Sequence, residues 1–222
     1  MKTRNTRKTI VFQGDSVTDA GRSGSADSFA LGSGYVSLLA AKIGVDHAAD
    51  NYLILNKGVG GDKVVQLFAR WRDDVLNIHP QILSILIGVN DSYGEYTPWH
   101  NGVAHEKFRR VYTLILDEAL ADNPDCKLVL CEPFSMPASL IKLGIKVQTP
   151  AKAKADLLGK QQIVKSLAEK YGACFVPLQE VFDRAQKKAR SVDYWILDGL
   201  HPSLSGHELI ARQWLDRAGS LL

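Results

Sequence analysis

Five short runs of almost uninterrupted apolar residues are spaced along this 222-residue chain. They are rich in Val, Ile and Leu and cover residues 9–13, 52–56, 82–87, 127–131 and 174–177. A strand that is covered on both faces needs such a run, whereas a strand with one wet face alternates apolar and polar residues. The runs therefore predict a sheet that is buried on both sides, as parallel sheets are.

Helical patterns lie between these runs. Apolar side chains recur every three or four residues within 64–75, 108–119, 157–171 and 204–218, and Gly172 follows the third segment as a stop signal. This alternation predicts an α/β fold, a three-layer α/β/α doubly wound sandwich with a parallel sheet of about five strands. No linker or repeat divides the chain, so residues 1–222 are expected to form one domain.

Composition excludes several classes of function. The chain has 27 Lys and Arg against 24 Asp and Glu, and the net charge of +3 is too small to predict nucleic-acid binding. The longest apolar runs have about seven residues, whereas a membrane span needs roughly 20. No signal-peptide core follows the basic first residues, so we expect a cytoplasmic location. The three cysteines are expected to be buried thiols, and no Cys/His cluster predicts a metal site.

Four polar blocks follow strands or lie near the C-terminus. The first run leads into GDSVTD at 14–19, the second into NKGVGGD at 56–62 and the third into GVND at 88–91. A fourth block, DGLHP, occupies 198–202. Ligand sites of doubly wound sheets lie beyond the carboxyl ends of the strands, so we expect the blocks to converge there.

Together the blocks resemble the SGNH hydrolases, also called the GDSL esterase/lipase family. Ser16, Gly61, Asn90 and His201 match the four residues for which that superfamily is named, and Val17 stands where the name-giving pattern has Leu. The resemblance extends from about residue 9 to about residue 215 and implies the flavodoxin-like SGNH hydrolase fold.

Three further motifs resemble the branch that contains bacterial carbohydrate acetylesterases. They are DSVTDAGR at 15–22, ARW at 69–71 and DGLHPS at 198–203. The resemblance implies a small-molecule ester substrate, an acylated carbohydrate in this branch. Members of the branch often oligomerise, so a homo-oligomer is an expectation. No motif implies a cofactor.

The same residues supply the groups that acyl transfer needs. Ser16 is the candidate nucleophile, His201 the base and Asp198 the carboxylate that orients the base, since an Asp and a His three residues apart can meet within one loop. The candidate oxyanion donors are the backbone N–H groups of Ser16 and Gly61 and the side-chain amide of Asn90. The prediction is a Ser-His-Asp triad with an acyl-enzyme intermediate.

Several aromatic residues and one arginine are candidates for contact with the substrate. Aromatic faces stack on sugar rings, but the same side chains could simply pack the loops, and Arg22 could brace the first loop instead. The candidates are Tyr93, Tyr96, Trp99, Tyr194, Trp195 and Arg22.

Other polar residues are interpreted as structural. Asp15 and Asp91 are expected to brace the loops that carry Ser16 and Asn90, Asp62 to cap the helix that begins there, and His207 to have a structural role. The long segment 132–149 is rich in apolar residues and could be a lid, an acyl-binding wall or an oligomer contact.

The favoured function is a serine esterase that removes acetyl or another short acyl group from a small carbohydrate. A lysophospholipase- or thioesterase-type hydrolase of lipids or thioesters is the alternative, because segment 132–149 could hold a long acyl chain. A non-catalytic binding module on the same fold would be expected to lose triad residues, and none is missing. The signatures of metallophosphoesterases are absent.

Overall fold

The computed structural model describes residues 7–25, 27, 29–136 and 149–222. Five parallel strands form one sheet in the order β2-β1-β3-β4-β5. The strands are β1 (Thr9–Gly14), β2 (Leu53–Asn56), β3 (Ile82–Leu86), β4 (Lys127–Cys131) and β5 (Cys174–Val176). The parallel sheet predicted from the apolar runs is thus confirmed, with strand limits within one residue of those expected.

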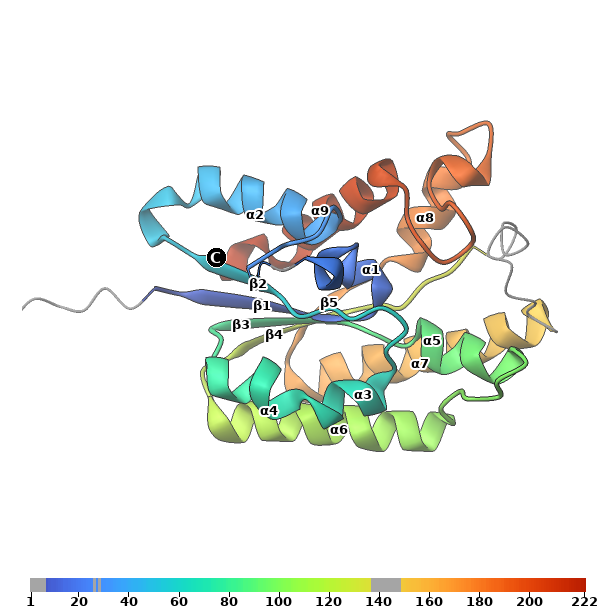
Figure 1. Ribbon diagram of the computed structural model, residues 1–222, viewed down its shortest axis with the longest axis horizontal. Helices are drawn as coiled ribbons and strands as arrows, with labels where there is room; N and C mark the ends of the chain where they lie inside the picture. The colour runs from blue at the N-terminus through green and yellow to red at the C-terminus, as the bar shows by residue number, and fades with distance from the viewer. Residues whose placement is uncertain (1–6, 26, 28, 137–148) are drawn as a thin grey trace, which may run out of the picture.

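Helices cover both faces of the sheet and give the three layers seen in Figure 1. One face carries α2 (Tyr35–Asp46), α8 (Gln179–Gln186) and α9 (Leu204–Ala218), and the other carries α3 (Val64–Ala69), α4 (Trp71–Asp74), α6 (His105–Asp122) and α7 (Pro150–Tyr171). Two short helices, α1 (Ser16–Asp19) and α5 (Val89–Tyr93), follow β1 and β3 directly. The expected three-layer α/β/α sandwich is therefore confirmed.

Alternate residues of the central strand enter different cores. Ile10 and Phe12 of β1 pack into the cluster with α2 and α9, whereas Val11 packs into the cluster with α3, α6 and α7. Each core contains a buried tryptophan, Trp214 in the first and Trp71 in the second. Burying an aromatic side chain of this size removes a large apolar area from water and stabilises the fold by about 3 kcal/mol.

The helical pattern at 64–75 is interrupted, unlike the single helix that its spacing suggests. Helix α3 ends at Ala69 and α4 begins at Trp71, because Arg70 between them has φ −113° and ψ 14°. By contrast, Gly172 ends α7 in the left-handed conformation, as predicted. The sequence pattern did not locate α2 or α8.

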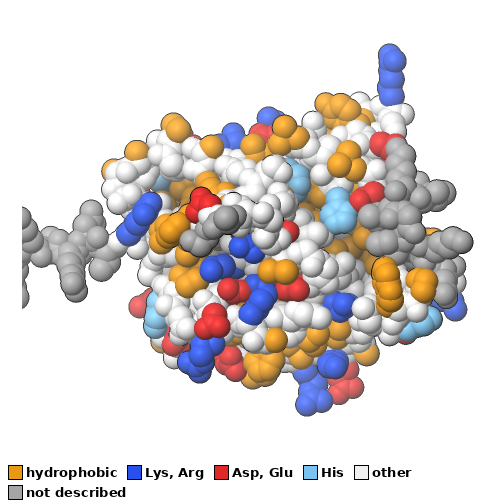
Figure 2. Space-filling view, viewed as in Figure 1, with side chains coloured by type: hydrophobic (Ala, Val, Ile, Leu, Met, Phe, Trp, Pro, Cys, Tyr) orange, Lys and Arg blue, Asp and Glu red, His pale blue; other side chains and the backbone are white. Residues whose placement is uncertain are grey.

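The charges on the surface agree with the composition (Figure 2), and two of the three thiols are buried as expected. Figure 2 shows basic and acidic side chains interspersed on the face in view. Cys126, Cys131 and Cys174 are free thiols. Cys126 and Cys131 are buried, and burial raises the pKa of Cys131 to about 12, whereas Cys174 is only partly buried. Among the described helices, none combines the length and apolarity that crossing a bilayer requires.

Candidate active site

Ser16 is the first residue of α1, directly beyond the carboxyl end of β1. The side chain of Asp15 caps this helix by accepting the Val17 N–H at 3.0 Å. Ala20 then ends the helix with a left-handed backbone (φ 42°). The Ser16 hydroxyl is therefore presented on a tight, capped turn at the sheet edge where sites of doubly wound folds lie.

A continuous hydrogen-bonded chain joins Ser16, His201 and Asp198. The Ser16 Oγ lies 2.8 Å from His201 Nε2, and His201 Nδ1 lies 2.7 Å from Asp198 Oδ2. The other carboxylate oxygen of Asp198 accepts the backbone N–H groups of His201 and Leu200, at 2.8 and 3.0 Å. Gly199 turns the loop with φ 92°, a conformation that favours glycine. The local Asp–His contact expected from their spacing is present.

The same contacts set the proton affinities of the pair. The hydrogen bond to Asp198 raises the pKa of His201, against an opposing effect of desolvation. Desolvation alone would raise the pKa of Asp198, but its hydrogen bonds from His201 and Leu200 bring the net pKa below the usual value. An ionised Asp198 accepts from Nδ1–H, which leaves the Nε2 lone pair facing the Ser16 hydroxyl.

The loop after β2 packs closely against α1. A Cβ atom on Gly58 would lie 2.3 Å from the Asp19 amide nitrogen, so only glycine allows this approach. A Cβ atom on Gly60 would lie 3.9 Å from the Ser16 Cβ, and Gly61 has φ 82°. The structure thus brings the loop that carries Gly61 next to Ser16, with a backbone that favours glycine.

Asn90 lies in α5 and is tied to this loop. Its Nδ2 donates to the backbone carbonyl of Asp62 at 3.1 Å, which uses one of the two amide hydrogens. The neighbouring Asp91 is buried and accepts the Val64 N–H at 3.1 Å, which fixes the start of α3 to α5. The second amide hydrogen of Asn90 has no partner among the described residues, so it is available to a ligand oxygen.

Both bracing aspartates are almost completely buried. Desolvation raises the pKa of Asp15 and the pKa of Asp91 to about 7 each, against the lowering effect of their hydrogen bonds from Val17 and Val64. Each carboxylate holds the backbone of a loop in the candidate site, so the expectation that they brace these loops is confirmed.

Two further expectations have different outcomes. The prediction that Asp62 caps a helix is wrong, because Lys63 is the N-cap of α3 and the Asp62 carboxylate pairs with Arg70 at 2.9 Å. His207 is structural as expected, since its Nδ1 accepts the Tyr35 N–H at 3.2 Å and burial lowers its pKa to about 4. The sequence had given Arg70 no role beyond its place in the ARW motif.

Arg22 braces the first loop. Its Nη2 donates to the carbonyl of Gly58 at 2.6 Å, and its Nε lies 3.8 Å from Asp19. These contacts join the segment after α1 to the loop after β2. Of the two alternatives for Arg22, the structure supports the bracing role.

The aromatic candidates occupy different environments. Tyr93 is only 3% exposed, and its hydroxyl is 2.8 Å from the Ser135 Oγ, so it packs the loops instead of facing a ligand. Tyr96 and Trp195 are partly buried against apolar clusters. Trp99 and Tyr194 are 66% and 57% exposed and remain free to contact a ligand.

A pocket of about 410 Å³ opens beside the Ser16–His201 pair. It lies between α1 and the start of α9, and His207 and Ser33 contribute polar groups to its lining. Leu197 and Leu204, which are 52% and 67% exposed, contribute apolar surface. A ligand seated here would meet both polar and apolar groups next to the hydroxyl of Ser16.

Only part of segment 132–149 can be described. Phe134 stacks on Phe182 with ring centroids 4.4 Å apart, and Met136 is buried in the same core. Glu132 accepts the backbone N–H groups of Leu178 and Gln179 at 2.8 and 2.9 Å. Residues 132–136 are therefore part of the core. The lid, acyl-binding wall or oligomer contact expected for segment 132–149 falls mainly on residues 137–148, which lie outside the described residues.

Known proteins match this chain over most of its length. The model of the GDSL-like Lipase/Acylhydrolase family matches residues 12–209. An acetylxylan esterase from Geobacillus stearothermophilus is 30% identical over 215 residues, which are 95% of this chain and 93% of that protein.

Solved structures resemble the whole fold. A candidate GDSL-like lipase from Parabacteroides merdae ATCC 43184 superposes with a TM-score of 0.86 at 35% identity, covering 97% of this chain and 98% of its own. The crystal structure of the acetylxylan esterase from Geobacillus stearothermophilus gives a TM-score of 0.81 at 27% identity, with 94% and 93% coverage. The resemblance therefore covers almost the whole length of the chain.

Proposed function

Because the chain belongs to the GDSL-like lipase/acylhydrolase family and is a carboxylic ester hydrolase, we propose that it removes acetyl or other short acyl groups from small carbohydrates. The observation that carries the proposal is the chain of contacts from Ser16 Oγ through His201 to Asp198. It lies at the carboxyl ends of the strands, beside a pocket open to a ligand.

In the proposed first half-reaction, His201 Nε2 accepts the Ser16 proton while Oγ attacks the ester carbonyl carbon. The carbonyl oxygen becomes an oxyanion, to which the N–H groups of Ser16, Gly61 and the Asn90 amide donate. Asp198 stabilises the imidazolium that forms. As the tetrahedral intermediate collapses, His201 gives its proton to the leaving alcohol oxygen and the acyl group stays on Ser16.

In the second half-reaction, His201 takes a proton from a water molecule that attacks the acyl-enzyme. The tetrahedral intermediate uses the same oxyanion donors, and its collapse returns the proton to the Ser16 oxygen. A carboxylic acid leaves and the free enzyme is restored. Each donor is expected to contribute about 10²- to 10³-fold to the rate, or roughly 3–4 kcal/mol.

Two observations support a carbohydrate ester as the substrate. The similar protein from Geobacillus stearothermophilus is an acetylxylan esterase. In this chain, the exposed rings of Trp99 and Tyr194 are free to stack on a sugar, and Ser33 and His207 offer polar groups in the pocket. Tyr93 is not part of this proposal because it is buried.

A second candidate is the hydrolysis of lipid esters or thioesters. The observation that favours it is the pair of exposed leucines, Leu197 and Leu204, at the pocket beside Ser16. An acyl chain could cover them and remove their apolar surface from water. This candidate predicts rates that rise with acyl length.

The test is hydrolysis of p-nitrophenyl esters from acetyl to dodecanoyl by the wild-type protein and Ser16→Ala. The proposal predicts a Ser16-dependent kcat/KM that is highest for acetyl, followed by activity on acetylated xylo-oligosaccharides. A maximum at long chains would favour the lipid candidate. Hydrolysis that persists in Ser16→Ala would contradict both. The cytoplasmic location and the homo-oligomer stay predictions.

A further inference from the structure

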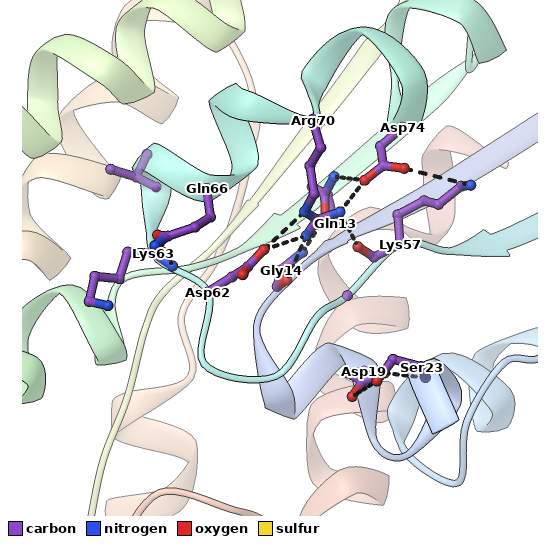
Figure 3. Close-up of polar contacts among 12 residues, drawn as sticks. Gln13, Gly14, Asp19, Ser23, Lys57, Asp62, Lys63, Gln66, Arg70 and Asp74 are labelled. Carbon is purple, nitrogen blue, oxygen red and sulfur yellow. Dashed lines mark hydrogen bonds and ion pairs between the residues drawn. The ribbon is translucent and has the colours of Figure 1, made fainter. Parts of the chain in front are cut away.

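Arg70 occupies the break between α3 and α4, and its side chain turns back toward the ends of β1 and β2 (Figure 3). Because the backbone at Arg70 departs from the helix, its guanidinium reaches Gln13 and Gly14, which are 57 and 56 residues earlier in the chain. The residue at the break between the two helices is therefore also the arginine of the ARW motif.

The guanidinium contacts the end of β1 and the loop after β2, the two segments that lead to Ser16 and Gly61. Nε donates to the Asp62 carboxylate at 2.9 Å, Nη1 to the Lys57 carbonyl at 2.7 Å and Nη2 to Gln13 Oε1 at 2.9 Å. Nη2 also lies 3.5 Å from the Gly14 carbonyl. A planar group with donors in fixed directions can hold these acceptors together, which a single ammonium group cannot do.

Charge in this cluster is balanced. Arg70 also pairs with Asp74, and Lys57 Nζ lies 3.7 Å from the same carboxylate, so two cations face two carboxylates. Burial raises the pKa of Asp62, and Arg70 opposes that effect. The side chains of Arg70 and Asp62 are 23% and 12% exposed, so their interaction is less screened than that of a surface pair.

The two held segments lead to two of the candidate oxyanion donors directly and support the third, Asn90 of α5, through the Asp62 carbonyl. Asp62 directly follows Gly61, and its carbonyl accepts the Asn90 amide, so one residue connects Arg70 with two donors. Gly14 is two residues before Ser16, whose backbone N–H is the third. Displacing the loop at Asp62 would move Gly61 and remove the support of Asn90 together.

We propose that Arg70 is a positioning residue that sets the geometry of the oxyanion donors through Asp62 and the ends of β1 and β2. This inference rests on the proposed serine-esterase function. Arg70 itself does not touch the substrate. Its effect falls on the transition state, because the donors bind the oxyanion and have little to bind in the ground state.

The first measurement compares Arg70→Ala with the wild type on p-nitrophenyl acetate. Misplaced donors predict a kcat lower by about 10- to 100-fold with KM changed by less than about threefold. Arg70→Lys keeps the charge but cannot span Asp62, Lys57 and Gln13, so it is expected to recover only part of the loss. Guanidinium chloride at low millimolar concentration should raise the kcat of Arg70→Ala, and ammonium chloride should not.

Val75→Ala is the matched control for loss of stability. Val75 lies just after α4 and its side chain is 1% exposed, in the core between the sheet and helices α3, α6 and α7. It carries no polar side-chain group. Under conditions in which both variants are fully folded, Val75→Ala should keep the wild-type kcat. The acid limb of the pH–rate profile should also stay unchanged in Arg70→Ala, because Arg70 contacts no described residue of the 198–201 loop.

Coupling to Asn90 gives a second readout. Because Arg70 and Asn90 both hold Asp62, the loss in the double variant with Asn90→Ala should be smaller than the product of the single losses. Wild-type kcat in Arg70→Ala, equal losses in Val75→Ala, or a full product in the double variant would overturn the inference. A wild-type protein without Ser16-dependent hydrolysis would instead overturn the proposed function.

Discussion

Asp198→Asn is expected to disable His201 by fixing the wrong tautomer. One carboxylate oxygen of Asp198 accepts two backbone N–H groups at 2.8 and 3.0 Å, and the other accepts from His201 Nδ1 at 2.7 Å. An asparagine must keep its carbonyl oxygen on the two backbone donors, so its NH₂ group would face Nδ1. Nδ1 must then accept a hydrogen bond, which leaves the proton on Nε2, opposite Ser16.

A protonated Nε2 cannot accept the Ser16 proton. The equivalent change in a serine protease triad lowers kcat by about 10⁴-fold, and we expect a loss of about 10³- to 10⁴-fold here. At 1.36 kcal/mol for each factor of ten, this is roughly 4–5.5 kcal/mol of lost transition-state stabilisation. The hydrogen bond that His201 donates to Asp198 also raises the pKa of His201, so activity of the wild type should fall as the pH drops through a value above 6.5. In the variant this limb should move to lower pH.

The assay is the pH dependence of kcat/KM on p-nitrophenyl acetate, with Asp73→Asn as the control. Asp73 is exposed in α4 and bonds only to Asn77 among the described residues, so this variant should retain wild-type kinetics. A loss below tenfold in Asp198→Asn, or an acid limb that does not move, would refute the tautomer argument.

Three other variants test separate parts of the structure. Asn90→Ala should lower kcat by about 10²- to 10³-fold with little change in KM, measured by steady-state kinetics; an equal rise in KM would show that the amide also binds the ground state. Trp214→Ala should lower the free energy of unfolding by about 3–5 kcal/mol in a denaturant titration, because it leaves a cavity and removes the 3.0 Å bond to the Ser84 Oγ. Asp15 has a folded-state pKa of about 7 against an ordinary 3.8, so the folded state binds more protons and this carboxyl's contribution to stability falls as pH rises from 4 to 7. Asp15→Asn can still accept the Val17 N–H but does not titrate. The free energy of unfolding of this variant minus that of the wild type should therefore be larger at pH 8 than at pH 4. The same difference at both pH values would contradict the assigned pKa.

Local features of the site could be predicted because they depend on short stretches of chain. Asp198 and His201 lie three residues apart, so their contact needs only one loop. The position of Ser16 follows from the end of β1, since a buried apolar run must stop where polar residues begin. For the same reason the five strands were located within one residue by their apolar composition alone.

The features that were missed depend on contacts between distant segments. Asp62 precedes a helix and has the chemistry of a cap, but Arg70 competes for its carboxylate, and that competition exists only because the helix breaks at Arg70. Tyr93 follows the Asn90 block like a site residue, yet it is buried against Leu157 of α7, and its hydroxyl contacts Ser135, 42 residues later. Neither outcome can be read from local spacing.

The role of Ser16 as nucleophile can be tested by finding where the acyl group resides during turnover. The protein is mixed with p-nitrophenyl acetate, quenched in acid within the first turnovers and mapped by peptide mass spectrometry. We expect an acetyl group on the peptide that contains Ser16, on the serine oxygen, and no such adduct in Ser16→Ala. Turnover with the acetyl group on a different residue, or with no acyl-enzyme on the time scale of a burst, would contradict the assignment of Ser16 as the nucleophile.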